Sequence, residues 1–116
     1  MANTFKVVTK AGVTSPDVIY TAGSGVTAIV LGLILGNTTT SQITSTVTLT
    51  SDTSSRAGAN NEDNQAVELI TDAPIPAGSS LELLSGNKVV LEVTDTLSVT
   101  GSGATDVALS IMEITA

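Results

Sequence analysis

The chain of 116 residues contains no cysteine and no histidine. Without cysteine there is no disulfide framework, no thiolate nucleophile and no thiolate metal site. Without histidine the chain also lacks the usual general base near neutral pH and the commonest metal ligand. The common nucleophilic triads are therefore excluded.

Aromatic residues are almost as scarce, because Phe5 and Tyr20 are the only two and tryptophan is absent. One aromatic side chain can bury on the order of 150–250 Å². A core with so few of them must be built from valine, isoleucine and leucine, and we expect contacts between subunits to supply part of the burial. A carbohydrate-binding or adhesive module is disfavoured, since such a module would need exposed aromatic residues.

Positive charge is also scarce: eleven acidic residues stand against four basic ones, which gives a net charge of −7. Such a field repels phosphate backbones and anionic lipids, so we expect no nucleic-acid or membrane partner. Lys6 and Lys10 make the N-terminal segment the only locally basic part of the chain. Residues 1–10 are interpreted either as a docking arm or as a solvated first strand.

No long apolar run is present. The most apolar segment, Val26 to Leu35, has about half of the roughly 20 residues that a membrane helix needs. The N-terminus shows no basic segment followed by a long apolar one, so we expect no secretory signal and synthesis in a cytoplasm.

The remaining side chains offer little chemistry. Paired carboxylates could divide acid and base roles, but an acidic solvated face is the simpler interpretation of Glu82, Glu92, Asp95 and Glu113. The polar stretch from Asp52 to Asn64 has oxygen ligands without the spacing of an EF-hand, and its role stays open. We expect no enzymatic activity, no cofactor and no metal.

What the sequence does contain is a succession of β-strand patterns separated by turn residues. The pattern predicts a single all-β domain over residues 1–116, an antiparallel two-sheet sandwich or flattened, jelly-roll-like barrel of about eight strands with an extended N-terminal arm. The expected strands are 5–11, 18–22, 26–35, 43–50, 67–71, 80–84, 88–93, 96–100 and 107–114. Gly86-Asn87 is expected to close a hairpin between two of them.

The segment from Val26 to Leu35 is apolar on both faces, which predicts that both faces are covered. One cover would be the facing sheet and the other a loop or a second subunit. Gly32 would mark a bulge or a close backbone approach. The candidate subunit contact consists of Val26, Ile29, Leu31, Leu33 and Leu35.

Several motifs in order resemble the small virion structural proteins of tailed bacteriophages, especially marine and cyanobacterial ones. They are Met1-Ala2-Asn3-Thr4-Phe5-Lys6, Tyr20-Thr21, Val30-Leu31-Gly32-Leu33, Gly36-Asn37-Thr38, Pro74 to Leu81, Lys88 to Glu92 and Ser110 to Ile114. The resemblance implies a non-enzymatic protein of the virion, assembled in the host cytoplasm.

Within that group we favour a capsid decoration or cement protein, typically a trimer, that binds the major capsid protein and reinforces contacts between capsomers. A neck, tail or fibre-associated subunit is the alternative. The N-terminal arm would bind the partner by adding a strand to an exposed sheet edge, with its lysines meeting acidic shell residues. The candidate partner-binding residues are Thr4, Phe5, Lys6, Val7, Val8 and Lys10.

Overall fold

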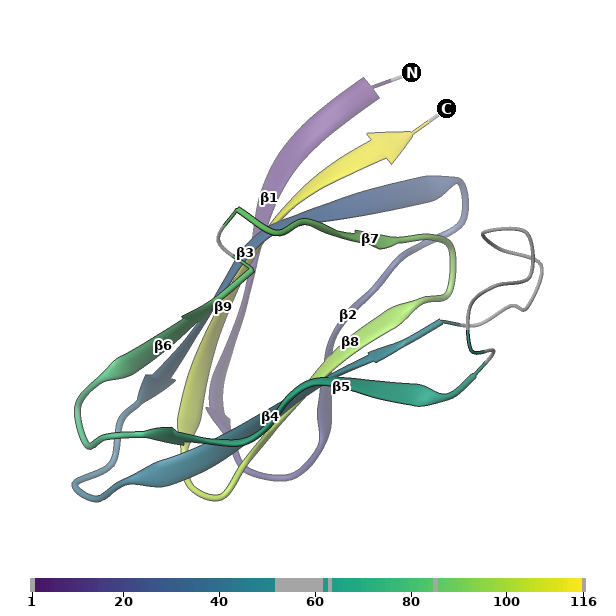
Figure 1. Ribbon diagram of the computed structural model, residues 1–116. Helices are drawn as coiled ribbons and strands as arrows, with labels where there is room; N and C mark the ends of the chain where they lie inside the picture. Colours follow the sequence, from purple (N-terminus) through teal and green to yellow (C-terminus); the bar gives the residue numbers. More distant parts are fainter. Residues whose placement is uncertain (1, 52–61, 63, 85, 116) are drawn as a thin grey trace.

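The computed structural model describes residues 2–51, 62, 64–84 and 86–115. These residues form two antiparallel sheets packed face to face as a sandwich, which confirms the predicted all-β class (Figure 1). The sheets stay open and do not close into a barrel. The predicted polar loop from Asp52 to Asn64 falls outside the described residues, except for Glu62 and Asn64.

The first sheet contains five strands in the order β1-β9-β3-β6, with β7 also paired to β3. Their bounds are β1 (Ala2–Val13), β3 (Val26–Asn37), β6 (Ser80–Leu83), β7 (Val89–Leu91) and β9 (Thr105–Thr115). The second sheet has the order β2-β8-β4-β5. It consists of β2 (Asp17–Thr21), β4 (Ile43–Thr50), β5 (Ala66–Ile75) and β8 (Thr96–Gly101). The chain crosses between the sheets at most connections, as in a jelly roll.

The expected hairpin at Gly86-Asn87 is wrong. Strand β6 pairs with Leu33–Gly36 and β7 pairs with Ala28–Val30, so the two lie end to end along β3 instead of beside each other. Positive φ angles at Leu84 (64°) and Gly86 (82°) divert the chain and then let it resume the same direction. Gly86 therefore lies where one edge strand is interrupted. A hairpin would instead have reversed the direction of the chain.

The irregularity expected at Gly32 is confirmed. The register of β3 against β9 shifts between Val30 and Gly32, so that one extra residue, Leu31, is accommodated on β3. A β-bulge of this kind bends the strand locally. It lies between the stretch of β3 that pairs with β7 and the stretch that pairs with β6.

The core between the sheets is aliphatic, as expected from the scarcity of aromatic residues. The buried apolar side chains of the described residues are all alanine, valine, leucine or isoleucine, including Val30, Leu35, Val47, Leu97 and Leu109. Tyr20 packs against this cluster from its margin. Burial alternates along most of β4, with the side chains of Ile43 and Val47 in the core.

A buried asparagine ties the end of β3 to its surroundings. The Nδ2 group of Asn37 donates hydrogen bonds to the carbonyl oxygens of Ser41 (2.8 Å) and Ile75 (2.9 Å). Its Oδ1 atom accepts from the backbone N–H of Thr39 (2.8 Å). A buried polar group is costly unless it is paired, and these bonds pair the Asn37 amide. The bond to Ile75 also joins the first sheet to β5 of the second.

Candidate interaction surface

One face of the first sheet points away from the second sheet, and no layer of described residues covers it. Its side chains follow from the register. Phe5 of β1 lies opposite Met112 of β9, Met112 lies opposite Ile29 of β3, and Ile29 lies opposite Val90 of β7. A straight row of four apolar side chains therefore crosses the sheet from edge to edge.

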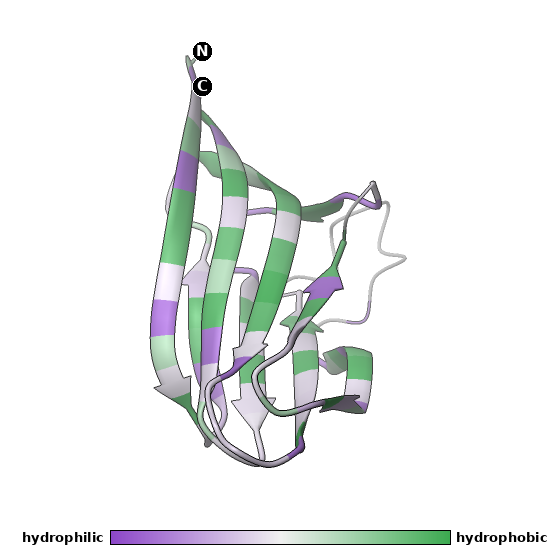
Figure 2. Ribbon diagram, turned by 90° about the vertical axis from the view of Figure 1, so that its left-hand side faces the viewer, coloured by the Kyte–Doolittle hydropathy of each residue, from purple (hydrophilic) through white to green (hydrophobic). Residues whose placement is uncertain are grey.

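Three further apolar side chains extend this row along the strands. Val7 follows Phe5 on β1, while Leu31 and Ile34 follow Ile29 on β3. We call these seven residues the outer apolar face: Phe5, Val7, Ile29, Leu31, Ile34, Val90 and Met112. Figure 2 shows apolar residues recurring along the long strands of this sheet.

The outer apolar face is open to solvent. Phe5 is 72% exposed, Val7 63%, Val90 54% and Ile34 45%. Isolated exposed apolar residues are common on proteins, but a contiguous apolar patch generally marks an interaction site. Because these residues are neighbours across adjacent strands, they form one contiguous patch.

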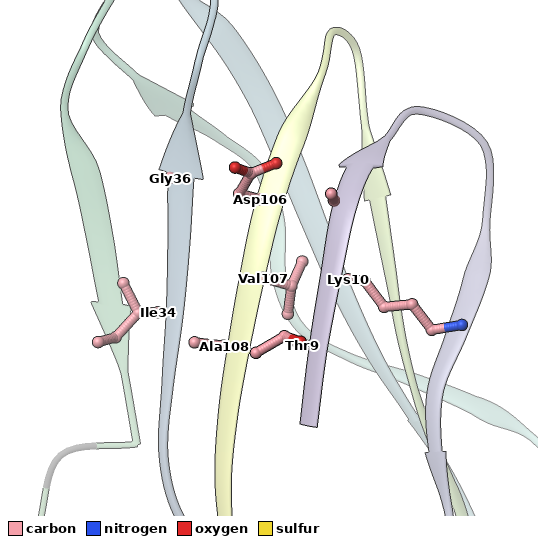
Figure 3. Close-up of a pocket in the computed structure, with 8 residues that line it drawn as sticks. Thr9, Lys10, Ile34, Gly36, Asp106, Val107 and Ala108 are labelled. Carbon is pink, nitrogen blue, oxygen red and sulfur yellow. The ribbon is translucent and has the colours of Figure 1, made fainter. Parts of the chain in front are cut away.

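A hollow with a cavity volume of about 350 Å³ lies next to this face. Its lining includes Gly36, which has no side chain, and Ala108, which has a small one, together with Thr9, Ile34 and Asp106 (Figure 3). The Oδ1 atom of Asp106 accepts a hydrogen bond of 3.0 Å from the backbone N–H of Gly12. The hollow could receive an apolar side chain of a neighbouring molecule.

The segment predicted as an arm is a strand of the first sheet. From Ala2 to Lys10 each residue of β1 pairs with β9 without interruption, and the opposite edge of β1 is free among the described residues. The candidate binding residues divide between the two sides of this strand. Phe5 and Val7 point outward, whereas Thr4, Lys6, Val8 and Lys10 lie on the side of the second sheet.

Lys6, for which the sequence predicts acidic neighbours in a partner, has an acidic neighbour within the chain. Its Nζ atom lies 2.7 Å from Oε1 of Glu113 on β9. The hydroxyl group of Tyr20, on β2 of the second sheet, donates a hydrogen bond of 2.6 Å to Oε2 of the same carboxylate. This contact between strands remote in the sequence could not be read from composition or spacing.

The network also changes the titration of its members. The hydrogen bond from Lys6, followed by the one from Tyr20, lowers the pKa of the Glu113 carboxyl below its ordinary value. Burial, together with the bond to the Glu113 carboxylate, raises the pKa of Tyr20 above its ordinary value. At neutral pH the fold therefore holds Glu113 charged and Tyr20 neutral.

The predicted subunit contact on β3 needs correction in two of its five residues. Leu33 and Leu35 are buried in the core of the chain itself, so neither is available to a second subunit. Ile29 and Leu31 belong to the outer apolar face, and Val26 is half-buried at the start of the strand. The prediction treated both faces of β3 alike because both are apolar.

The carboxylates weighed as a catalytic pair do not gather into one site. Glu113 is held by Lys6 and Tyr20, and Asp95 accepts a hydrogen bond of 3.0 Å from the backbone N–H of Glu92 in a turn. Glu82 lies on the outer face of β6.

Within the described ranges no group of three or more acidic side chains could hold a metal ion, and no helix is long and apolar enough to cross a membrane.

Comparison with known proteins adds little information about this chain. No family model matches the chain, and no curated protein matches it. A solved structure described as "Bacillus endospore appendages form a novel family of disulfide-linked pili" is similar over 99% of this chain and 88% of its own, with a TM-score of 0.48 and 12% identity. At these values the likeness carries no conclusion about function.

Proposed function

We propose that this chain is a non-enzymatic structural subunit of a multi-copy assembly, and that the outer apolar face joins it to neighbouring protein chains. The observation that carries the proposal is the row Phe5, Met112, Ile29 and Val90, which crosses the whole width of a sheet that no layer of described residues covers. Covering apolar surface is the main driving force of most protein association.

The chemistry of the described residues supports a binding role over catalysis. The chain has no histidine and no cysteine, and the lysine and carboxylate that come closest together, Lys6 and Glu113, form an ion pair at the junction of the two sheets. We assign this ion pair to the stability of the fold.

The finer assignment rests on the sequence resemblance to virion proteins of tailed bacteriophages. In that setting the assembly is a virus particle, with the chain either as a capsid decoration protein bound to the major capsid protein or as a neck, tail or fibre-associated subunit. A decoration protein would form a small closed oligomer, typically a trimer. A neck, tail or fibre subunit would form a ring, sleeve or filament.

The first test is the association state of the purified chain, measured by sedimentation velocity from 1 to 200 μM and by negative-stain electron microscopy. We expect concentration-dependent oligomers. A closed trimer would favour the decoration role, and rings or filaments the alternative. A monomer across the whole range would overturn assembly with copies of itself.

Two matched variants locate the contact. Val90→Ser removes an apolar group from the outer apolar face, and Val67→Ser makes the same change on β5, where Val67 is 45% exposed. We expect Val90→Ser to weaken association about tenfold and Val67→Ser to leave it unchanged. Equal effects of the two changes would contradict the role of this face.

A further inference from the structure

We infer that β1 is an assembly edge, and that two copies of this chain pair through it by antiparallel β1-to-β1 addition centred on Val7. The inference rests on the proposed function and adds an edge contact to the contact made by the outer apolar face. It starts from the edges of the two sheets. An unpaired edge strand presents a row of free backbone donors and acceptors, and proteins generally interrupt or cover such edges.

Three of the four sheet edges in the described part of the chain are interrupted. The edge formed by β6 and β7 is broken by the diversion at Leu84 and Gly86. Strand β5 contains Pro74 and two register shifts against β4. Strand β2 has only five residues and a register shift between Val18 and Tyr20. None of these edges offers a long regular ladder.

The edge of β1 is interrupted only near its end, where the register against β9 shifts between Lys10 and Val13. Nine consecutive residues, Ala2 to Lys10, keep a regular register against β9, and the segment contains no proline. A second copy of the chain offers the same regular edge and no comparable alternative among its described residues. Pairing of β1 with β1 is therefore the edge contact that keeps the longest regular ladder, and it is symmetric about a two-fold axis.

The lysines select the register of this contact. Residues directly opposite each other in an antiparallel pair point to the same face, so only residues of like orientation can be opposed. Centring on Lys6 would oppose it to its own copy, and centring on Val8 would oppose Lys6 to Lys10. Like charges directly opposite each other are destabilising.

Centring on Val7 avoids both conflicts. It opposes Lys6 to Val8 and Lys10 to Thr4, and it overlaps β1 from position 2 to position 12, of which the part up to Lys10 has a regular register against β9. Centring on Phe5 also avoids like charges but overlaps a shorter stretch. With Val7 at the axis, Phe5 lies diagonally across from Val7 of the second copy, within reach of a large side chain.

This arrangement joins the two outer apolar faces. Phe5 and Val7 are the most exposed large apolar side chains of the described residues, at 72% and 63%, and both lie on β1. In the pair they would form one apolar stripe across the axis, continuous with Met112 of each copy. These side chains then shield one another at the sides, while the rest of the outer apolar face stays open.

Charge substitution tests the inference. Because Val7 lies at the axis, Val7→Lys places two lysines opposite each other, and Val7→Glu places two carboxylates there. We expect each variant alone to weaken dimerisation at least tenfold in sedimentation velocity. An equimolar mixture of the two should restore it to within about threefold of the wild type. Val67→Lys on β5 is the matched control and should dimerise normally.

Single-cysteine cross-linking tests the register, since the chain has no cysteine of its own. Under mild oxidation Val7→Cys should give a disulfide-linked dimer on a non-reducing gel, whereas Val67→Cys and Phe5→Cys alone should not. A mixture of Phe5→Cys and Thr9→Cys should give a mixed dimer. Cross-linking by Phe5→Cys alone would overturn the register.

The result also separates this inference from the proposed function. Wild-type assembly that Val7→Lys leaves intact, with no Val7→Cys cross-link, would overturn β1 pairing while the structural role stands. A wild-type chain that is monomeric throughout would overturn both. Circular dichroism and thermal melting of each variant distinguish loss of the dimer from loss of the fold. We expect the fold to be kept, because Val7 is exposed in the single chain.

Discussion

At the scale of single residues, Glu113 connects the two sheets of the sandwich. It receives a contact from each sheet, through Lys6 on β1 and Tyr20 on β2. The side chain of Glu113 is 15% exposed and that of Lys6 is 53% exposed, so solvent screens the ion pair in part. The hydrogen bond from Tyr20 is partly buried, and it links the two sheets directly.

Replacing this carboxylate should lower stability in a pH-dependent way. We expect Glu113→Gln to reduce the free energy of unfolding by about 0.5–1 kcal/mol at pH 7, measured by urea denaturation. The folded-state pKa of Glu113 is lowered, so its contribution is present above the ordinary Glu pKa of about 4.3 and is lost as pH falls through the folded value.

The difference between wild type and Glu113→Gln should therefore shrink as the pH is lowered from 5 to 3. Glu82→Gln, on the outer face of β6, is the control and should change the unfolding free energy little. A Glu113→Gln deficit that stays constant across this acid range would contradict the assigned ionic role.

At the scale of elements, β3 has one face in the core and the other on the surface of the first sheet. It pairs with β9 on one side and with β6 and β7 on the other. Leu33 lies in the core and its neighbour Ile34 on the outer apolar face, 1% and 45% exposed respectively. Two adjacent apolar residues of one strand thus have different tasks.

Truncating these neighbours should separate folding from association. Leu33→Ala should lower the free energy of unfolding by about 2–5 kcal/mol, because it leaves a cavity in a packed core. Ile34→Ala should cost less than about 1 kcal/mol, since its side chain is already half in water, and should weaken association instead. Chemical denaturation and sedimentation velocity measure the two effects. Comparable stability losses in the two variants would contradict the assigned orientation of β3.

At the scale of the whole molecule, charge and apolar surface oppose each other. The net charge of −7 disfavours the approach of two copies, while the outer apolar face favours it. The chain measures 44 × 28 × 23 Å. At 10 mM salt the Debye length of about 30 Å exceeds its two shorter dimensions, and at 0.15 M it falls to about 8 Å.

Added salt should therefore strengthen self-association. We expect the dissociation constant, measured by sedimentation equilibrium, to fall several-fold between 10 mM and 150 mM sodium chloride. Screening reduces the repulsion between copies and leaves the apolar contact intact. A dissociation constant that rises with salt would indicate a contact dominated by opposite charges, against the apolar interface proposed above.

The part of this protein that local sequence pattern determines is its set of strands. The strands expected at 26–35 and 43–50 lie close to the observed bounds of β3 and β4, because side-chain period and turn residues act over a few neighbours. The aliphatic core followed from composition, and the bulge at Gly32 from a glycine inside a strand.

Tertiary structure alone decided which strands are partners and which faces are covered. The hairpin at Gly86 failed because β3 offered both flanking strands a partner that local turn chemistry does not reveal. Lys6 met Glu113, and Leu33 entered the core beside an exposed Ile34, through pairings between residues far apart in the chain. Such long-range pairing depends on the packing of both sheets at once, so the outer apolar face became visible only when the register across four strands was known.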